Sequence, residues 1–123
     1  MQYISANQAP TAIGPYSHAI KANGMLYLSG QLPLEPKSGE ILQGGIAEQT
    51  KQVLRNITAV LTAAGSDISK VVKTTCFLID MNDFAAFNEV YASHFTHKPA
   101  RSCVAVSALP RGARVEVEVV AES

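Results

Sequence analysis

The sequence predicts a single α+β domain, residues 1–123, in which a β-sheet carries two helices on one face. Strand-like and helix-like segments alternate along the chain, and only two segments show helical periodicity. The last strand-like segment, 114–121, alternates valine with glutamate, so one side of this strand is apolar and the other polar. Because two helices cover only one face, we expect the other face to pack against the same sheet in neighbouring subunits.

A β-hairpin is predicted after an irregular opening segment. Residues 17–22 and 25–29 are strand-like and flank Asn23-Gly24. This dipeptide favours a two-residue hairpin turn, because both turn positions adopt positive φ. A loop at 31–39 is then expected to lead into a short strand at 40–42.

A long amphipathic helix and a central strand are predicted in the middle of the chain. Apolar residues recur at intervals of three, four and seven between 46 and 64, which is the spacing of one helix face. Gly65 is the expected end of this helix. Residues 71–80 are mostly apolar and β-branched, as is typical of a central strand.

A second helix and two further strands complete the predicted fold. The helix is expected to be capped by Asn82 or Met81 and to end before Pro99. Its inner stripe consists of Phe84, Phe87, Val90, Tyr91 and Phe95. Strands are predicted at 101–106 and 114–121, joined as a hairpin by a turn around 110–112.

The composition excludes several classes of function. Apolar residues make up 47% of the chain and charged residues 16%, and the formal net charge is zero. This is a globular composition, and the absence of a basic run argues against a nucleic-acid partner. No apolar stretch reaches the roughly 20 residues of a membrane span, and residues 1–10 show no signal-peptide pattern. A cytoplasmic protein is expected, either cytosolic or in an organellar matrix, with Cys76 and Cys103 as buried free thiols.

Arg101 and a glutamate on the last strand are the strongest candidates for chemistry. A guanidinium group matches a carboxylate through two parallel hydrogen bonds, and a glutamate can orient a water or accept a proton. If Cys103 pairs with Glu116 in the predicted hairpin, then Arg101, Cys103 and Glu116 line one face. Periodicity does not separate Glu116 from Glu118. The alternative is a solvent-exposed or structurally paired arginine and glutamates on a solvated strand face.

Other candidate residues carry weaker signals. Ser29-Gly30 ends a predicted strand, where a glycine lets a ligand approach the backbone and its N–H can donate to an anion. Tyr16 presents its hydroxyl to a ligand or anchors the N-terminal segment, and Asn88 lies on the second helix. His18 has no partner in a known motif, so it is interpreted as structural or surface-exposed.

No cofactor or metal is expected. His94 and His97 lack further ligands for a metal site. The chain contains no phosphate loop, dinucleotide fingerprint, nucleophile elbow or paired-cysteine zinc motif.

Several motifs, in order along nearly the whole chain, resemble those of the Rid (reactive intermediate deaminase, or YjgF) family, and most closely its RidA branch. The matching segments are Gly14-Pro15-Tyr16-Ser17, Leu28-Ser29-Gly30-Gln31, Asn56-Ile57, Asp83-Phe84 to Asn88, Pro99-Ala100-Arg101-Ser102-Cys103-Val104, and Leu109-Pro110 through Gly112-Ala113 to Val115-Glu116. The arginine motif and the Leu-Pro segment are the most specific of these.

The resemblance implies a chorismate-mutase-like mixed sheet and a homotrimer with a central barrel and clefts between subunits. It also implies hydrolysis of 2-aminoacrylate, 2-iminobutanoate and 2-iminopropanoate to 2-keto acids and ammonia, without metal or cofactor. Arg101 would clamp the substrate carboxylate and Glu116, in preference to Glu118, would orient the attacking water. The rest of the cleft would be formed by Tyr16, Ser29, Asn88 and the backbone of Gly30 and Cys103.

Other readings remain open. The same cleft in a trimer would serve a protein that binds keto acids without turnover. Relatives described as ribonucleases and chaperones imply further activities, although the neutral charge argues against RNA. A chorismate mutase would have to bind two carboxylates, and only one arginine clamp is evident. The connection 94–98 is shorter than in some relatives, which is expected to change the cleft rim and the preferred substrate size.

Overall fold

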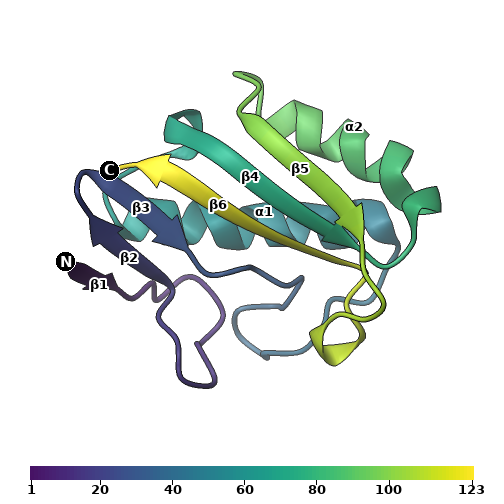
Figure 1. The fold of residues 1–123 in the computed structure, drawn as a ribbon. Coiled ribbons are helices and arrows are strands. Elements are labelled where there is room, and N and C mark those ends of the chain that lie inside the picture. Colours follow the sequence, from purple (N-terminus) through teal and green to yellow (C-terminus); the bar gives the residue numbers. More distant parts are fainter.

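One six-stranded sheet and two α-helices make up the computed structural model, which describes residues 1–123. The strands lie in the order β1-β2-β3-β6-β4-β5, and every neighbouring pair is antiparallel except β4 and β5 (Figure 1). The elements are β1 (Gln2–Ile4), β2 (Ala19–Ala22), β3 (Met25–Leu28), α1 (Ile46–Ala63), β4 (Val71–Leu78), α2 (Phe84–His94), β5 (Ala100–Ala105) and β6 (Val115–Glu122).

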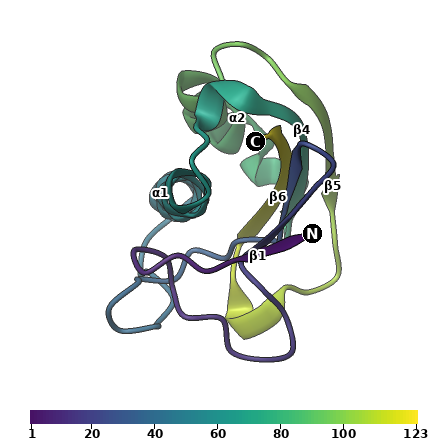
Figure 2. The same cartoon turned by 90° about the vertical axis from the view of Figure 1, so that its left-hand side faces the viewer.

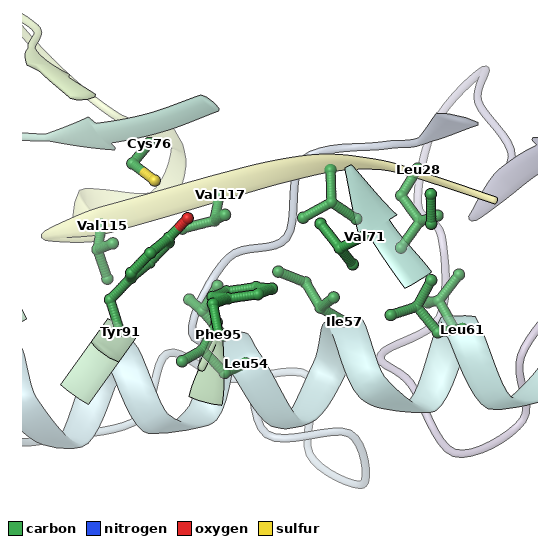
Figure 3. Close-up of a cluster of buried hydrophobic side chains, with 14 of the residues drawn as sticks. Leu28, Leu54, Ile57, Leu61, Val71, Cys76, Tyr91, Phe95, Val115 and Val117 are labelled. Carbon is green, nitrogen blue, oxygen red and sulfur yellow. The ribbon is translucent and has the colours of Figure 1, made fainter. Parts of the chain in front are cut away.

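Both helices lie on the same side of the sheet, as predicted (Figure 2). The core between the two layers joins α1, α2 and the inward side chains of the sheet (Figure 3). On β6 the valines at 115, 117 and 119 are at most 1% exposed, while the residues between them face the other way. The strict alternation of this strand therefore reflects a sheet with one face covered by the helices and one face open.

The predicted hairpin is confirmed, and the opening segment contains a strand that was not predicted. Asn23 and Gly24 join β2 to β3 with φ values of 52° and 77°. β1 pairs antiparallel with β2, so the N-terminus forms one edge of the sheet. The three residues of β1 are too few to show periodicity in the sequence.

The predicted strand at 40–42 is wrong, because this segment forms only an isolated bridge between Leu34 and Ile41 within a loop. The prediction for α1 is confirmed, and Gly65 follows it with a φ of 79°. This positive φ is easily adopted by glycine, which explains why the helix ends there.

The expected cap of the second helix is wrong. The residue at the N-cap position of α2 is Asp83, and its side chain forms no capping hydrogen bond. Instead the Asp80 side chain accepts from the backbone N–H of Asn82 at 2.8 Å and caps a short 3₁₀ turn, Met81–Asp83. The chain thus enters α2 through this turn.

The predicted hairpin between the last two strands is also wrong. β5 pairs in parallel with β4 through the α2 crossover, and β6 lies on the other side of β4. The connection of residues 106–114 carries the chain past the end of β4, with a 3₁₀ turn at Pro110–Gly112. Because β4 separates β5 from β6, Cys103 and Glu116 are not cross-strand neighbours.

The face of the sheet opposite the helices has no covering element in the chain (Figure 2). Tyr3 and Tyr27 belong to one cross-strand row, because both align with Ile20, and they are 68% and 49% exposed. Val104, which aligns with Phe77 further along the sheet, is 47% exposed. No helix of the protein has the length and apolar character needed to cross a membrane.

Candidate functional site

Arg101 lies on the helix-covered face of the sheet. It aligns with Thr74 of β4, whose side chain is fully buried beneath α2. Residues in register on neighbouring strands share a face of the sheet, so Arg101 also faces α2. Because β5 is an edge strand of the sheet, the Arg101 side chain is only half-buried.

Three residues of α2 hold the guanidinium group of Arg101. Its Nη1 donates a hydrogen bond to the Asn88 side-chain oxygen at 2.6 Å. The guanidinium carbon lies 4.7 Å from the centre of the Tyr91 ring and 5.5 Å from that of Phe84. Phe84, Asn88 and Tyr91 are spaced by four and three residues, so they form one stripe on the helix.

No carboxylate neutralises Arg101 within the chain, since the single ion pair of the structure joins Arg111 to Glu40 at 3.7 Å. Guanidinium has five N–H donors, and its one side-chain acceptor here is a neutral amide. An adjoining pocket of about 340 Å³ contains a second cation, Lys98, and no acidic residue. We call this the Arg101 pocket; it is lined by Asn88, Tyr91, Ala92, Phe95, Thr96, Lys98, Pro99 and Arg101.

The thiols of Cys103 and Cys76 are neighbours of Arg101 on the same face of the sheet. Burial raises the pKa of Cys103, and the nearby positive charge of Arg101 only partly offsets this effect. Burial likewise raises the pKa of Cys76 to about 12. Both free cysteines are therefore neutral thiols at physiological pH, as expected for groups that do not act as nucleophiles.

Glu116 lies on the opposite face of the sheet and contacts Gly30. It aligns with Phe77 on β4, whereas its neighbours Val115 and Val117 are fully buried beneath the helices. A β-carbon at Gly30 would overlap the Glu116 carboxylate. Glycine is thus required at position 30 for this carboxylate to approach the chain.

The pKa of the Glu116 carboxyl is raised above its usual value of 4.5. Burial is the main cause, and the negative charge of Glu118 on the same strand face adds to it. A raised pKa makes the ionised Glu116 a better proton acceptor than an exposed carboxylate.

A second pocket, of about 460 Å³, surrounds Glu116 and Gly30. We call it the Glu116 pocket; it is lined by Thr11, Ile13, Tyr16, Ser29, Gly30, Leu32, Leu34, Pro110, Arg111 and Glu116. Tyr16 is 49% exposed at this pocket. The Ser29 hydroxyl donates to the Ser17 carbonyl at 2.6 Å. This bond joins the residue that follows β3 to the segment that precedes β2, beside the pocket.

The predicted residues are thus divided between two places. Tyr16, Ser29, Gly30 and Glu116 line the Glu116 pocket, and Asn88 and Arg101 line the Arg101 pocket. Cys103 lies beside Arg101 but lines neither pocket. The expectation that Arg101, Cys103 and Glu116 share one face is wrong, because Glu116 aligns with Val104 across β4.

Sequence reasoning missed the surroundings of Arg101. The helical periodicity places Phe84 and Tyr91 only in the apolar stripe of α2, and no local pattern singles out Thr74. The signal that could have found them is the stripe of Phe84, Asn88 and Tyr91, which places an amide between two aromatic rings on one helix face.

The histidines are engaged by the backbone. The Nδ1 atom of His18 accepts from the Ala6 N–H at 2.9 Å, and Nε2 lies 2.8 Å from the Pro10 carbonyl. This confirms the interpretation of His18 as a structural residue. His97 Nε2 lies 2.7 Å from the Val71 carbonyl. No group of three or more His, Cys, Asp or Glu side chains is arranged to hold a metal ion.

The fold and the two pockets define a two-layer α+β protein in which an arginine without an acidic partner lines one pocket. Residues 6–123 match the family model described as Endoribonuclease L-PSP. The 2-iminobutanoate/2-iminopropanoate deaminase of Mus musculus is 50% identical over 119 residues, which cover 96% of this chain and 88% of that relative. The chain belongs to the Endoribonuclease L-PSP family, which includes the YjgF and Rid proteins.

Solved structures agree with this assignment. RidA from the Antarctic bacterium Psychrobacter sp. PAMC 21119 is 40% identical with a TM-score of 0.96, and 100% of each chain is covered. TdcF of E. coli, solved with bound serine, is 38% identical with a TM-score of 0.95 and covers 100% of this chain and 99% of its own. The resemblance noted in the sequence is therefore confirmed at the level of family and fold.

Proposed function

We propose that the protein hydrolyses small 2-imino acids, and their enamine tautomers, to 2-keto acids and ammonia. Curated relatives that are 50% and 49% identical, from Mus musculus and Homo sapiens, carry the name 2-iminobutanoate/2-iminopropanoate deaminase. The substrates we propose for this chain are accordingly 2-iminobutanoate and 2-iminopropanoate, together with the enamine 2-aminoacrylate.

The observation that carries the proposal is the unpaired guanidinium of Arg101. A half-buried charge without an acidic partner is unfavourable unless an anion joins it. The free N–H groups suit a carboxylate, which accepts two parallel hydrogen bonds from such a group. TdcF, which was solved with bound serine, shows that a relative with this fold binds a small molecule bearing a carboxylate.

A complete site requires two copies of the chain. Arg101 and Glu116 face opposite sides of one sheet, so a single chain does not present both groups to one small substrate. The open face of the sheet carries exposed apolar side chains, among them Tyr27 and Val104, which association would cover. We therefore assign the active site to the contact between the Arg101 pocket of one subunit and the Glu116 pocket of the next, in a homotrimer.

The chemistry at this site demands little of the protein. The carbon of a protonated imine is already electrophilic, and Arg101 would fix the substrate through its carboxylate. Glu116 would hold a water molecule and accept its proton as the oxygen adds to that carbon. Glu116 then returns this proton to the nitrogen of the resulting carbinolamine, and the C–N bond breaks. The hydroxyl proton leaves with the nitrogen as ammonium, and the oxygen stays as the carbonyl of the 2-keto acid. One water is consumed and one ammonium released for each imine.

The test is the hydrolysis of 2-iminobutanoate generated in place by an amino-acid oxidase, with residual imine trapped by semicarbazide. The wild-type protein should remove the imine faster than water does, and Glu116→Gln should lower kcat by about 100-fold. Glu122→Gln, which changes an exposed glutamate at the far end of the same strand, is the matched control.

Two results would contradict the proposal. Equal turnover in Glu116→Gln and the wild type would remove Glu116 from the mechanism. A folded trimer that binds 2-oxobutanoate without accelerating hydrolysis would instead make the protein a keto-acid-binding protein.

A further inference from the structure

The proposed reaction does not by itself account for a buried hydrogen bond next to Arg101. The hydroxyl groups of Thr74 and Tyr91 lie 2.7 Å apart, and both residues are removed from solvent, with exposures of 0% and 6%. The Tyr91 side chain extends from α2 with its oxygen directed at the sheet (Figure 3). This bond connects the middle of β4 with α2 across the core.

The same two residues lie beside Arg101 on two different elements, β4 and α2. Thr74 is the register neighbour of Arg101 on the adjacent parallel strand, so its side chain stands beside that of Arg101 on the same face. The Tyr91 ring lies 4.7 Å from the guanidinium carbon. The hydrogen bond thus fixes the aromatic ring on which the guanidinium rests.

We propose that Thr74 and Tyr91 are positioning residues that set the orientation of the Arg101 guanidinium before the substrate arrives. This inference rests on the proposed function, in which Arg101 binds the substrate carboxylate. Asn88 takes one N–H, and the rings of Tyr91 and Phe84 restrict the plane of the group. The remaining N–H donors then point in a fixed direction.

Preorganisation matters here because arginine has a long side chain with many rotamers. Ordering such a side chain during binding lowers affinity, whereas a group ordered in advance avoids that loss. The Tyr91 hydroxyl contributes to the ordering of Arg101, because without it the Tyr91 ring is held by packing alone. The ring centre of Tyr91 lies 5.7 Å from that of Phe87 and 4.6 Å from that of Phe95.

The competing interpretation is that this hydrogen bond only stabilises the core. The two interpretations differ in what they predict for substrate binding. Arg101 contacts the carboxylate in the ground state and the transition state alike, so misplacing it raises KM and leaves kcat nearly unchanged. A purely structural bond would change the free energy of unfolding and neither kinetic constant.

The experiment uses the assembled full-length protein and two readouts. These are the steady-state kinetics of 2-iminobutanoate hydrolysis and the Kd of 2-oxobutanoate measured by calorimetry. Thr74→Val and Tyr91→Phe remove one hydroxyl each at nearly constant volume. Each should raise KM and Kd by about 5-fold, the value of one ordinary hydrogen bond, with kcat within about twofold. Thr74→Ser keeps the hydroxyl and should restore values near the wild type.

The double variant and a control test whether the two hydroxyl groups act as one unit. The combination of Thr74→Val with Tyr91→Phe should be no worse than either single change, because both remove the same bond. Thr50→Val removes another buried threonine hydrogen bond of 2.7 Å, to the Ile46 carbonyl within α1, away from both pockets. It should lower stability without changing KM or Kd.

Several outcomes would overturn the inference. They are an unchanged KM and Kd in Thr74→Val, a Thr74→Ser variant no better than Thr74→Val, and additive losses in the double variant. If the wild type binds 2-oxobutanoate but shows no turnover, the proposed reaction fails while the Kd series still decides the positioning role. A wild type that does neither overturns both.

Discussion

The Arg101 pocket and the Glu116 pocket are built in different ways. Every residue that contacts the guanidinium comes from one continuous β–α–β segment, β4 to β5, and lies on a helix or strand. The Glu116 pocket gathers loops near residues 11–16, 29–34 and 110–111 around the start of β6. The proposed substrate-binding group thus lies on regular elements, whereas the position of the proposed water-holding group, Glu116, depends on how distant segments meet. This difference predicts how each pocket responds to substitution.

Removal of the positively charged Arg101 side chain should have the largest effect. Arg101→Ala removes the only group that we assign to the carboxylate, so kcat/KM for 2-iminobutanoate should fall by about 1,000-fold. The measurement is the steady-state rate of the purified protein, with assembly checked by analytical ultracentrifugation. Arg55→Ala, which changes an exposed arginine on α1, should keep full activity. Loss of assembly in Arg101→Ala would mean that this arginine is mainly structural.

An added methyl group in the Glu116 pocket should have the next largest effect. A β-carbon at Gly30 overlaps the Glu116 carboxylate and must displace it, so Gly30→Ala should lower kcat by about 100-fold. KM should change much less, because in the proposed site the substrate carboxylate is held by Arg101 of the neighbouring subunit, and Gly30 does not line the Arg101 pocket. The control is Gly45→Ala, at a glycine with ordinary φ and no contact closer than 3.4 Å. A Gly30→Ala protein with normal kcat would place the reacting water elsewhere.

Loosening the N-terminal segment should have a moderate effect on one pocket only. His18 holds this segment through Ala6 and Pro10, and the chain that follows carries Tyr16 to the Glu116 pocket. His18→Leu should lower the free energy of unfolding by about 2 kcal/mol and kcat by a few-fold. Hydrogen exchange should accelerate at residues 6–16 and stay unchanged in α2. Equal acceleration in α2 would contradict the separation of the two pockets.

The smallest effect expected is a shift in the pH profile. The proposed mechanism requires ionised Glu116, so kcat should fall on acidification with a midpoint above the usual 4.5, since burial and Glu118 raise the pKa of Glu116. Glu118→Gln removes the repulsion and should move the midpoint to lower pH without changing the rate at neutral pH. If kcat depends on pH in the same way in the wild type and in Glu118→Gln, the fall of kcat at acidic pH does not report the ionisation of Glu116.

The difference between the two pockets, one built from a continuous segment and one from distant segments, also explains how much of the fold and the site could be predicted from the sequence. The stretch from 71 to 105 could be interpreted because its signals are local: a β-branched strand, the stripe of α2 and an arginine at the start of β5. The placement of β6 between β3 and β4 could not, because the pairing of distant strands leaves no mark in local periodicity. A hairpin is the simplest arrangement for consecutive strands, and this assumption put Glu116 on the face of Arg101. The role of α2 in holding Arg101 was missed because Tyr91 also fits the core.

The most direct test of the central claim, a site shared by two subunits, is a mixing experiment. Arg101→Ala and Glu116→Ala chains are each expected to be nearly inactive alone. If they are unfolded and refolded together in equal amounts, a shared site predicts that about a quarter of the sites in random trimers pair an intact Arg101 with an intact Glu116. Activity should therefore return to about a quarter of the wild-type value. Activity no higher than the sum of the two separate proteins would contradict the shared site and place both groups in one chain.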